Sequence, residues 1–166
     1  LRNFVPESIP IVVKEHPATF IKTRRGHVGR STLFYQILMS MNNVLLVSNT
    51  INTKELIDKA KITSTITGTA AFEASLRGKL AIVFGDAWYS GIPNVFEYCF
   101  INSYEEVAST IPSSSEVVKE SVIRKFAKYG MYSVQNLTGN KRFNYDGKKT
   151  EKIFFDSIYK ILKDKL

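Results

Sequence analysis

Hydrophobic positions along the chain alternate between short continuous runs, typical of buried strands, and stretches with a period near 3.6 residues, typical of helices. Strands are predicted over residues 9–14, 44–47, 62–66, 79–84 and 98–102. Helices are predicted over 32–41, 53–60, 103–111, 116–132 and 151–166, with a short additional helix opening within 67–74. Because strands and helices alternate, the sequence predicts an α/β fold whose parallel sheet is covered by helices on both faces.

Length and hydrophobic content favour one domain over residues 1–166, since 166 residues with 44% hydrophobic content can bury one substantial core. The final helix, 151–166, is amphipathic, with lysines near its end. No apolar stretch approaches the length of a membrane span. The chain begins Leu1-Arg2 without an initiator methionine, so we expect a fragment of a longer protein.

The turn at Thr67, Gly68 and Thr69 is the most informative local feature, because it links a β-branched strand to a helix within a predicted strand-helix-strand unit. Backbone N–H groups at a helix N-terminus attract anions, and Gly68 has no Cβ to hinder their approach. The turn matches neither the G-x-G-x-x-G dinucleotide motif nor the P-loop. It therefore predicts a site for a phosphorylated ligand without naming that ligand.

Glu73 has two interpretations at this stage. It stands four residues before Arg77, so the two could form an ordinary surface ion pair. Alternatively, a carboxylate one turn into the helix could accept hydrogen bonds from sugar hydroxyls, as acidic residues do for ribose in other α/β nucleotide sites. The residues alone leave both open.

Three segments are expected to meet at one edge of the sheet. His16 follows the first predicted strand, residues 67–69 follow the third, and residues 85–89 follow the fourth. Ligands of parallel sheets bind outside the carboxyl ends of the strands, so a shared cleft is predicted. His16 could donate to a phosphate or a leaving-group oxygen there, or simply cap the end of its strand.

Other candidate residues give weaker signals. Trp88 and Tyr89 could stack on a base or sugar, although such residues near strand ends are more often half-buried packing. Lys14 could be a substrate contact or face solvent. With two histidines and one cysteine, the chain offers no convincing metal-ligand spacing, and Cys99 is expected in a buried strand.

The net charge of +8 favours anionic partners, namely nucleotides, nucleic acid or an anionic membrane surface. A basic loop, residues 22–30, contributes to it. This loop lacks the interleaved aromatic residues that stack nucleic-acid bases, so charge alone does not select the partner.

The sequence resembles the C-terminal half of bacterial capsular polysaccharide biosynthesis glycosyltransferases, the capsule-synthesis family that includes Kdo transferases. The resemblance covers roughly the first hundred residues in order and spacing. It rests on the His-Pro motif and on four further stretches, which read Val13-Lys14-Glu15-His16-Pro17, Gly29-Arg30 before Phe34-Tyr35, Thr65-Ile66-Thr67-Gly68-Thr69-Ala70-Ala71-Phe72-Glu73-Ala74, Gly78-Lys79 and Val83-Phe84-Gly85-Asp86-Ala87-Trp88-Tyr89.

This resemblance implies a GT-B architecture, in which a Rossmann-like C-terminal domain binds a nucleotide-sugar donor and an N-terminal domain, absent here, binds the glycan or glycolipid acceptor. By position, His16 contacts the donor phosphate, residues 67–69 cradle it, and Glu73 holds the ribose. Lys14, Gly85, Asp86, Trp88 and Tyr89 are candidate substrate contacts. No metal or cofactor is implied, and a catalytic base is expected on the absent half, so the chain alone should not transfer sugar.

A CMP-activated acidic sugar such as CMP-Kdo is the donor that the resemblance favours, in a cytoplasmic protein that could contact the inner membrane peripherally. UDP-sugar transferases, CDP-glycerol transferases and sugar-nucleotide epimerases of similar fold are alternatives. From a different class, a non-catalytic module for nucleic acid or acidic lipid would also suit the charge.

Overall fold

The computed structural model describes residues 1–21 and 28–129, and the chain divides into two compact units. Unit 1 comprises Leu1–Ala60 and Ile101–Ser109, and unit 2 comprises Lys61–Phe100 and Thr110–Leu166. The helix predicted over 151–166 and most of the basic loop lie outside the described residues. The expectation of a single domain stays a prediction.

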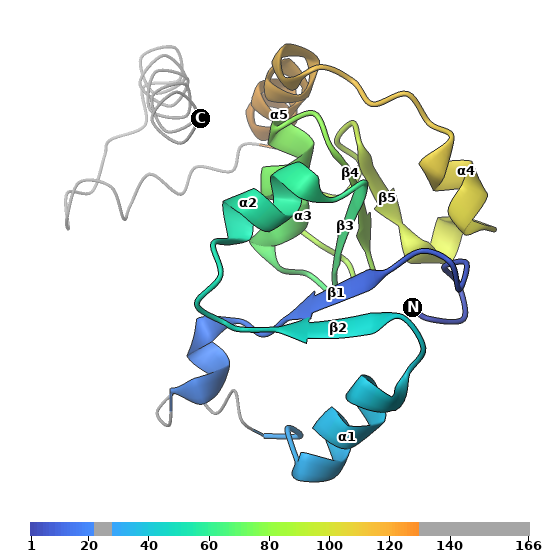
Figure 1. The fold of residues 1–166 in the computed structure, drawn as a ribbon. Helices are drawn as coiled ribbons and strands as arrows, with labels where there is room; N and C mark the ends of the chain where they lie inside the picture. The colour runs from blue at the N-terminus through green and yellow to red at the C-terminus, as the bar shows by residue number, and fades with distance from the viewer. Residues whose placement is uncertain (22–27, 130–166) are drawn as a thin grey trace. The chain divides into compact units, whose positions relative to one another are not determined.

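Unit 1 is built on two parallel strands, β1 (Ile11–Lys14) and β2 (Val44–Val47), paired in register from Ile11 with Val44 to Lys14 with Val47 (Figure 1). A 3-10 helix (Pro17–Phe20) and α1 (Thr32–Ser40) lie between them in the chain. Two further helices, α2 (Thr53–Lys59) and α4 (Tyr104–Ala108), complete the unit. Three helices begin at a short polar residue whose side chain caps the helix. These N-cap residues are Ser31 for α1, Asn52 for α2 and Ser103 for α4.

Unit 2 contains a three-stranded parallel sheet in the order β3 (Ile62–Thr65), β4 (Leu80–Val83) and β5 (Val95–Glu97). The crossover from β3 to β4 is α3 (Thr69–Leu76), and α5 (Ser115–Tyr129) follows later in the chain (Figure 1). Every residue of β4 is buried, which is the environment that its uninterrupted apolar run predicts. The predicted α/β fold with parallel, helix-flanked strands is thus confirmed.

Small side chains let α3 pack closely within unit 2. Ala71 and Ala74 are fully buried, and α3 contacts all three strands and α5. The Ser75 hydroxyl donates to the Pro93 carbonyl at 2.7 Å, so one polar group inside this layer is satisfied. Close approach of helix and sheet fixes the position of the helix N-terminus relative to the ends of the strands.

The strand predicted over 98–102 is wrong. β5 ends at Glu97, and Tyr98–Phe100 form a 3-10 helix in which Cys99 is exposed, not buried. The strand begins earlier because Asn94 adopts a left-handed conformation, with φ of 67°, and turns the chain into the sheet at Val95. Apolar residues run almost continuously through this region, so periodicity could not locate the strand.

Positive charge is unevenly distributed along the chain. The described residues carry twelve Lys and Arg side chains and eleven Asp and Glu side chains, a net charge of +1. The other +7 of the net charge lies in residues 22–27 and 130–166. In the described part of the chain, no helix is both long and apolar enough to cross a membrane.

Candidate functional site

The carboxyl ends of β3 and β4 bring two predicted site segments side by side. Beyond the last paired residues of the strands, Phe84 N–H donates to Thr65 O and Gly85 N–H donates to Ile66 O, each at 3.0 Å. Residues 67–69 therefore lie next to the start of the loop 85–89. Gly85 packs closely at this junction, because an added Cβ would lie 2.9 Å from Thr67 Cγ2 and the threonine side chain would have to shift.

The N-terminus of α3 has no side-chain cap. Gly68 is the N-cap residue, with φ of −71° and ψ of 156°, and it offers no side-chain hydrogen bond to the first turn. The first N–H groups of a helix have no partner within the helix, and they carry partial positive charge. Since α1, α2 and α4 are capped by Ser31, Asn52 and Ser103, α3 differs from them in leaving these donors to another acceptor.

Gly68 is fixed from two sides within unit 2. Its N–H donates to Thr65 Oγ1 at 3.2 Å, and an added Cβ would lie only 2.8 Å from that oxygen. The close approach therefore requires glycine for packing as well as for ligand access. Because the Gly68 amide is used internally, the N–H groups available to an anion are those of the residues that follow it.

Tyr89 supports the turn from inside the unit. Its hydroxyl donates to the Gly68 carbonyl at 2.5 Å, and its ring packs against Phe72 and Trp88 with centroid distances of 5.5 and 5.1 Å. Burial raises the pKa of the Tyr89 phenol, which keeps it a donor at neutral pH. The ring has no exposed face, so Tyr89 positions Gly68 and does not stack on a substrate.

Glu73 is half-buried and contacts the first turn of its own helix. Its Oε1 accepts a hydrogen bond from Thr69 Oγ1 at 3.3 Å, while Arg77 is the C-cap residue at the opposite end of α3. The carboxylate therefore lies on the side of the uncapped N-terminus. A ligand with hydroxyl groups could replace the Thr69 hydroxyl as donor.

The loop that follows β4 presents two exposed side chains. Asp86 is exposed, and Trp88 is 44% exposed while its ring packs 4.8 Å from the ring of Phe72. Lys125 of α5 donates to the Ser90 carbonyl and anchors the loop. Asp86 and Trp88 thus remain candidate substrate contacts on an anchored loop.

His16 lies in unit 1, where it caps the 3-10 helix that follows β1. Its Nδ1 accepts a hydrogen bond from Ala18 N–H at 3.0 Å, which assigns the proton of the neutral ring to Nε2. The side chain is exposed, so Nε2–H is a donor aimed at solvent or a ligand. Lys14 is half-buried at the end of β1. Because His16 and the α3 turn belong to different units, their shared cleft stays a prediction.

Arg30 belongs to the basic loop and to the stretches that carry the resemblance, but the sequence does not predict its contacts. Its Nε lies 2.6 Å from Glu15 Oε1, and its guanidinium lies 4.9 Å from the centroid of the Phe34 ring. Glu15 also accepts from the buried Thr19 hydroxyl at 3.3 Å and directly precedes His16. The pair joins residues fifteen apart in the chain, so no helical or strand period signals it.

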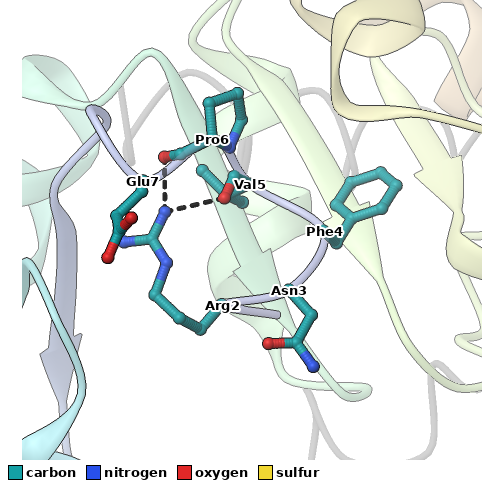
Figure 2. Close-up of a pocket in the computed structure, with 6 residues that line it drawn as sticks. All are labelled: Arg2, Asn3, Phe4, Val5, Pro6 and Glu7. Atoms are coloured by element: carbon teal, nitrogen blue, oxygen red, sulfur yellow. Dashed lines mark hydrogen bonds between the residues drawn. The ribbon is translucent and has the colours of Figure 1, made fainter.

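A hollow at the N-terminus of unit 1 is lined by residues 2–7 (Figure 2). The Arg2 guanidinium lies in the middle of this loop and donates to the carbonyl oxygens of Val5 at 2.7 Å and Pro6 at 2.5 Å. It also donates to Ile9 O at 3.0 Å and to Asn42 O at 3.3 Å. Arg2 therefore holds the loop on the turn before β2, and the hollow is not a candidate ligand site.

Potential metal-ligating side chains are spread over residues 1–21 and 28–129. Within these residues, no three His, Cys, Asp or Glu side chains gather into a cluster that could hold a metal ion. The expectation of metal-independent chemistry stays a prediction.

Comparison with known proteins gives one match. A family model described as "Capsule polysaccharide biosynthesis protein" matches residues 2–93, more than half of the chain. The match includes β1 with His16, the α3 turn with Glu73, and most of the loop that follows β4. No protein of curated function and no solved structure matches.

Proposed function

The chain belongs to the capsule polysaccharide biosynthesis family, and on that premise we propose that it is the donor-binding part of a glycosyltransferase that builds capsular or surface polysaccharide. The donor is a nucleotide sugar, with a CMP-activated acidic sugar such as CMP-Kdo as first choice. The architecture proposed for the whole enzyme is GT-B, with the acceptor held by a separate N-terminal domain.

The observation that carries this proposal is the uncapped N-terminus of α3, which opens at the carboxyl edge of the sheet beside Glu73. N–H groups at such a position suit a phosphate, and a carboxylate one turn away suits the hydroxyls of a ribose. The two chemistries occur together in a nucleotide. Family membership makes an activated sugar the natural form of that nucleotide.

In the proposed site each group has one task. The first-turn N–H groups of α3 bind a phosphate, Glu73 accepts from the ribose hydroxyls, and His16 Nε2–H donates to the phosphate or to the leaving-group oxygen. Gly85, Asp86, Trp88 and Lys14 are further candidate contacts. Stabilising the nucleotide leaving group by hydrogen bonds would allow transfer without a metal ion. The base that activates the acceptor is assigned to the N-terminal domain. The proposed location of the protein is the cytoplasmic side of the inner membrane.

A non-catalytic module for nucleic acid or acidic lipid is the main alternative from another class. The described residues carry a net charge of only +1, whereas residues 22–27 and 130–166 carry +7. A nucleic-acid interface would therefore have to draw on those segments. The charge of the described units does not favour it.

A titration of the chain with CMP, CDP, UDP and a single-stranded oligonucleotide separates these functions. We expect saturable binding of a mononucleotide with weak salt dependence, because one ligand phosphate group is engaged, and CMP preferred over UDP. Binding of the oligonucleotide alone, falling steeply with salt, would support the alternative. A clear preference for UDP would reject CMP-Kdo as donor, and sugar transfer by the isolated chain would contradict the assignment of the base to another domain.

His16→Asn tests the donor role of the histidine without removing its structural role. Asparagine is a good N-cap residue and can accept from Ala18 N–H as Nδ1 does, but it has no group in the place of Nε2–H. We expect CMP binding to weaken about 12- to 30-fold, which corresponds to roughly 1.5–2 kcal/mol, the lower part of the range for one hydrogen bond to a charged group. Circular dichroism and thermal unfolding should be unchanged. Unaltered CMP affinity in His16→Asn would remove His16 from the proposed site.

A further inference from the structure

An exposed row of apolar side chains crosses the carboxyl edge of the three-stranded sheet. Ile66, Phe84 and Tyr98 each follow directly after the last residue of β3, β4 and β5, and those last residues, Thr65, Val83 and Glu97, are paired in register. The exposed fractions are 69% for Ile66, 37% for Phe84 and 42% for Tyr98. The backbone bonds from Phe84 to Thr65 and from Gly85 to Ile66 continue the β3–β4 ladder, so Ile66 and Phe84 lie on one face. Tyr98 opens the 3-10 helix after β5, and its ring contact with Phe84 places it in the same row.

Two members of the row form an aromatic pair. The ring centroids of Phe84 and Tyr98 are 4.8 Å apart, with an angle of 40° between the ring planes. Each ring supports the other, so the pair is held in place although both rings are partly exposed. The pair is separate from the Phe72, Trp88 and Tyr89 cluster, which packs against α3.

The aromatic pair lies next to the α3 turn. Phe84 directly precedes Gly85, whose N–H donates to Ile66 O. Gly85 also lies close to Thr67, because an added Cβ would be 2.9 Å from the threonine methyl group. Adjacent strands are about 5 Å apart, so Phe84 lies one strand spacing and Tyr98 two strand spacings from β3. This separation is of the size that divides the base of a nucleotide from its phosphate.

We propose that the Phe84–Tyr98 pair is the platform on which the nucleobase of the bound nucleotide stacks, a role that rests on the proposed function. Every nucleobase has a flat π-face, which an exposed aromatic ring binds by stacking. A base is favoured over a protein segment because the pair adjoins, on the same sheet edge, the uncapped α3 turn and the Glu73 carboxylate, which are proposed to bind phosphate and ribose. Stacking does not depend on base identity, so the platform supplies affinity and other groups select the base.

Phe84→Leu tests the platform in the full 166-residue chain, because leucine keeps an apolar side chain and removes the flat ring. Calorimetric titrations with CMP and with ribose 5-phosphate, which has no base, are compared for both proteins. We expect CMP binding to weaken about 5- to 100-fold in Phe84→Leu, while ribose 5-phosphate binding stays the same. UMP should lose affinity by the same factor as CMP.

Ile111→Ala is the matched control, since Ile111 is an apolar side chain of unit 2 that is 91% exposed and follows α4. Its CMP affinity should equal that of the unmodified chain. An equal loss for CMP and ribose 5-phosphate in Phe84→Leu, or no loss at unchanged thermal stability, would overturn the platform. If the unmodified chain binds both ligands equally well, the platform alone fails. If it binds neither, the proposed function and the platform both fail.

Discussion

Replacing Glu73 with glutamine is expected to weaken CMP binding about 10- to 100-fold, which corresponds to roughly 1.5–3 kcal/mol for hydrogen bonds to a charged group. The carboxylate can accept from both ribose hydroxyls, whereas the amide has one oxygen to accept with and an NH₂ group that cannot. Because Glu73 lies on α3 and bonds the Thr69 hydroxyl only weakly, at 3.3 Å, the fold should tolerate the change. Affinity is measured by calorimetry.

A 2′-deoxynucleotide makes this test specific for the ribose. If Glu73 binds both hydroxyls, dCMP should bind more weakly than CMP to the unmodified chain but nearly as well as CMP to Glu73→Gln, since the two changes remove the same contact. Glu120→Gln serves as the control for the loss of one negative charge, because Glu120 pairs with Arg124 on the exposed surface of α5. Equal penalties for CMP and dCMP in Glu73→Gln would show that Glu73 does not hold the ribose.

Asn94→Ala should lower the free energy of unfolding of unit 2 by about 2–4 kcal/mol. The buried side chain accepts from Ser113 N–H at 2.7 Å and donates to Ser113 O at 2.9 Å, tying the turn before β5 to the segment that precedes α5. Alanine leaves both backbone groups without this partner. Alanine also tolerates a φ of 67° less well than asparagine does, which contributes a further part of the total. Urea unfolding followed by the fluorescence of Trp88, the one tryptophan of the chain, reports on this unit.

Asn94→Gly separates the two contributions, because glycine adopts positive φ without strain but makes no side-chain hydrogen bonds. It should be more stable than Asn94→Ala by about 1 kcal/mol and still less stable than the unmodified chain. Equal stability of all three proteins would mean that the Asn94 bonds do not hold α5 to the sheet.

Much of the fold could be predicted because local patterns coincide with tertiary burial. The run at 79–84 is continuously apolar, and the structure buries all of β4. Strand β2 begins and ends at the predicted residues, since Asn43 before it takes a positive φ that suits a turn. Ser31 and Ser103 stand at or directly before the start of predicted helices, and their hydroxyls accept from the N–H of the third helical residue, Phe34 and Glu106.

The start of β5 could not be predicted, because it depends on contacts between residues far apart. Asn94 sets the start of the strand through Ser113, nineteen positions later in the chain. The apolar residues on either side of Asn94 look equally suited to a strand. From the sequence alone, the strand is therefore predicted at 98–102, and Cys99 is predicted to be buried. Hydrophobic pattern thus indicates that a strand exists, while the polar turn residue determines where it begins.

In the candidate site, too, some features could be predicted from local sequence patterns and others could not. The position of the turn at residues 67–69 and of Glu73 follows from the strand-turn-helix pattern. The internal use of the Gly68 amide by Thr65, the Tyr89 bond to Gly68 O and the Arg30–Glu15 pair depend on side-chain packing that no spacing rule encodes. The two contacts to Gly68 fix the N-terminus of α3 in place.

The central claim is that the carboxyl edge of β3 and β4 binds a nucleotide, and backbone amide shifts during a CMP titration test it most directly. The largest shifts are predicted at Thr69, Ala70 and Ala71, with further shifts at Glu73 and in the loop 85–89. Shifts confined to residues 22–27 and 130–166, where most of the excess positive charge lies, would contradict the claim.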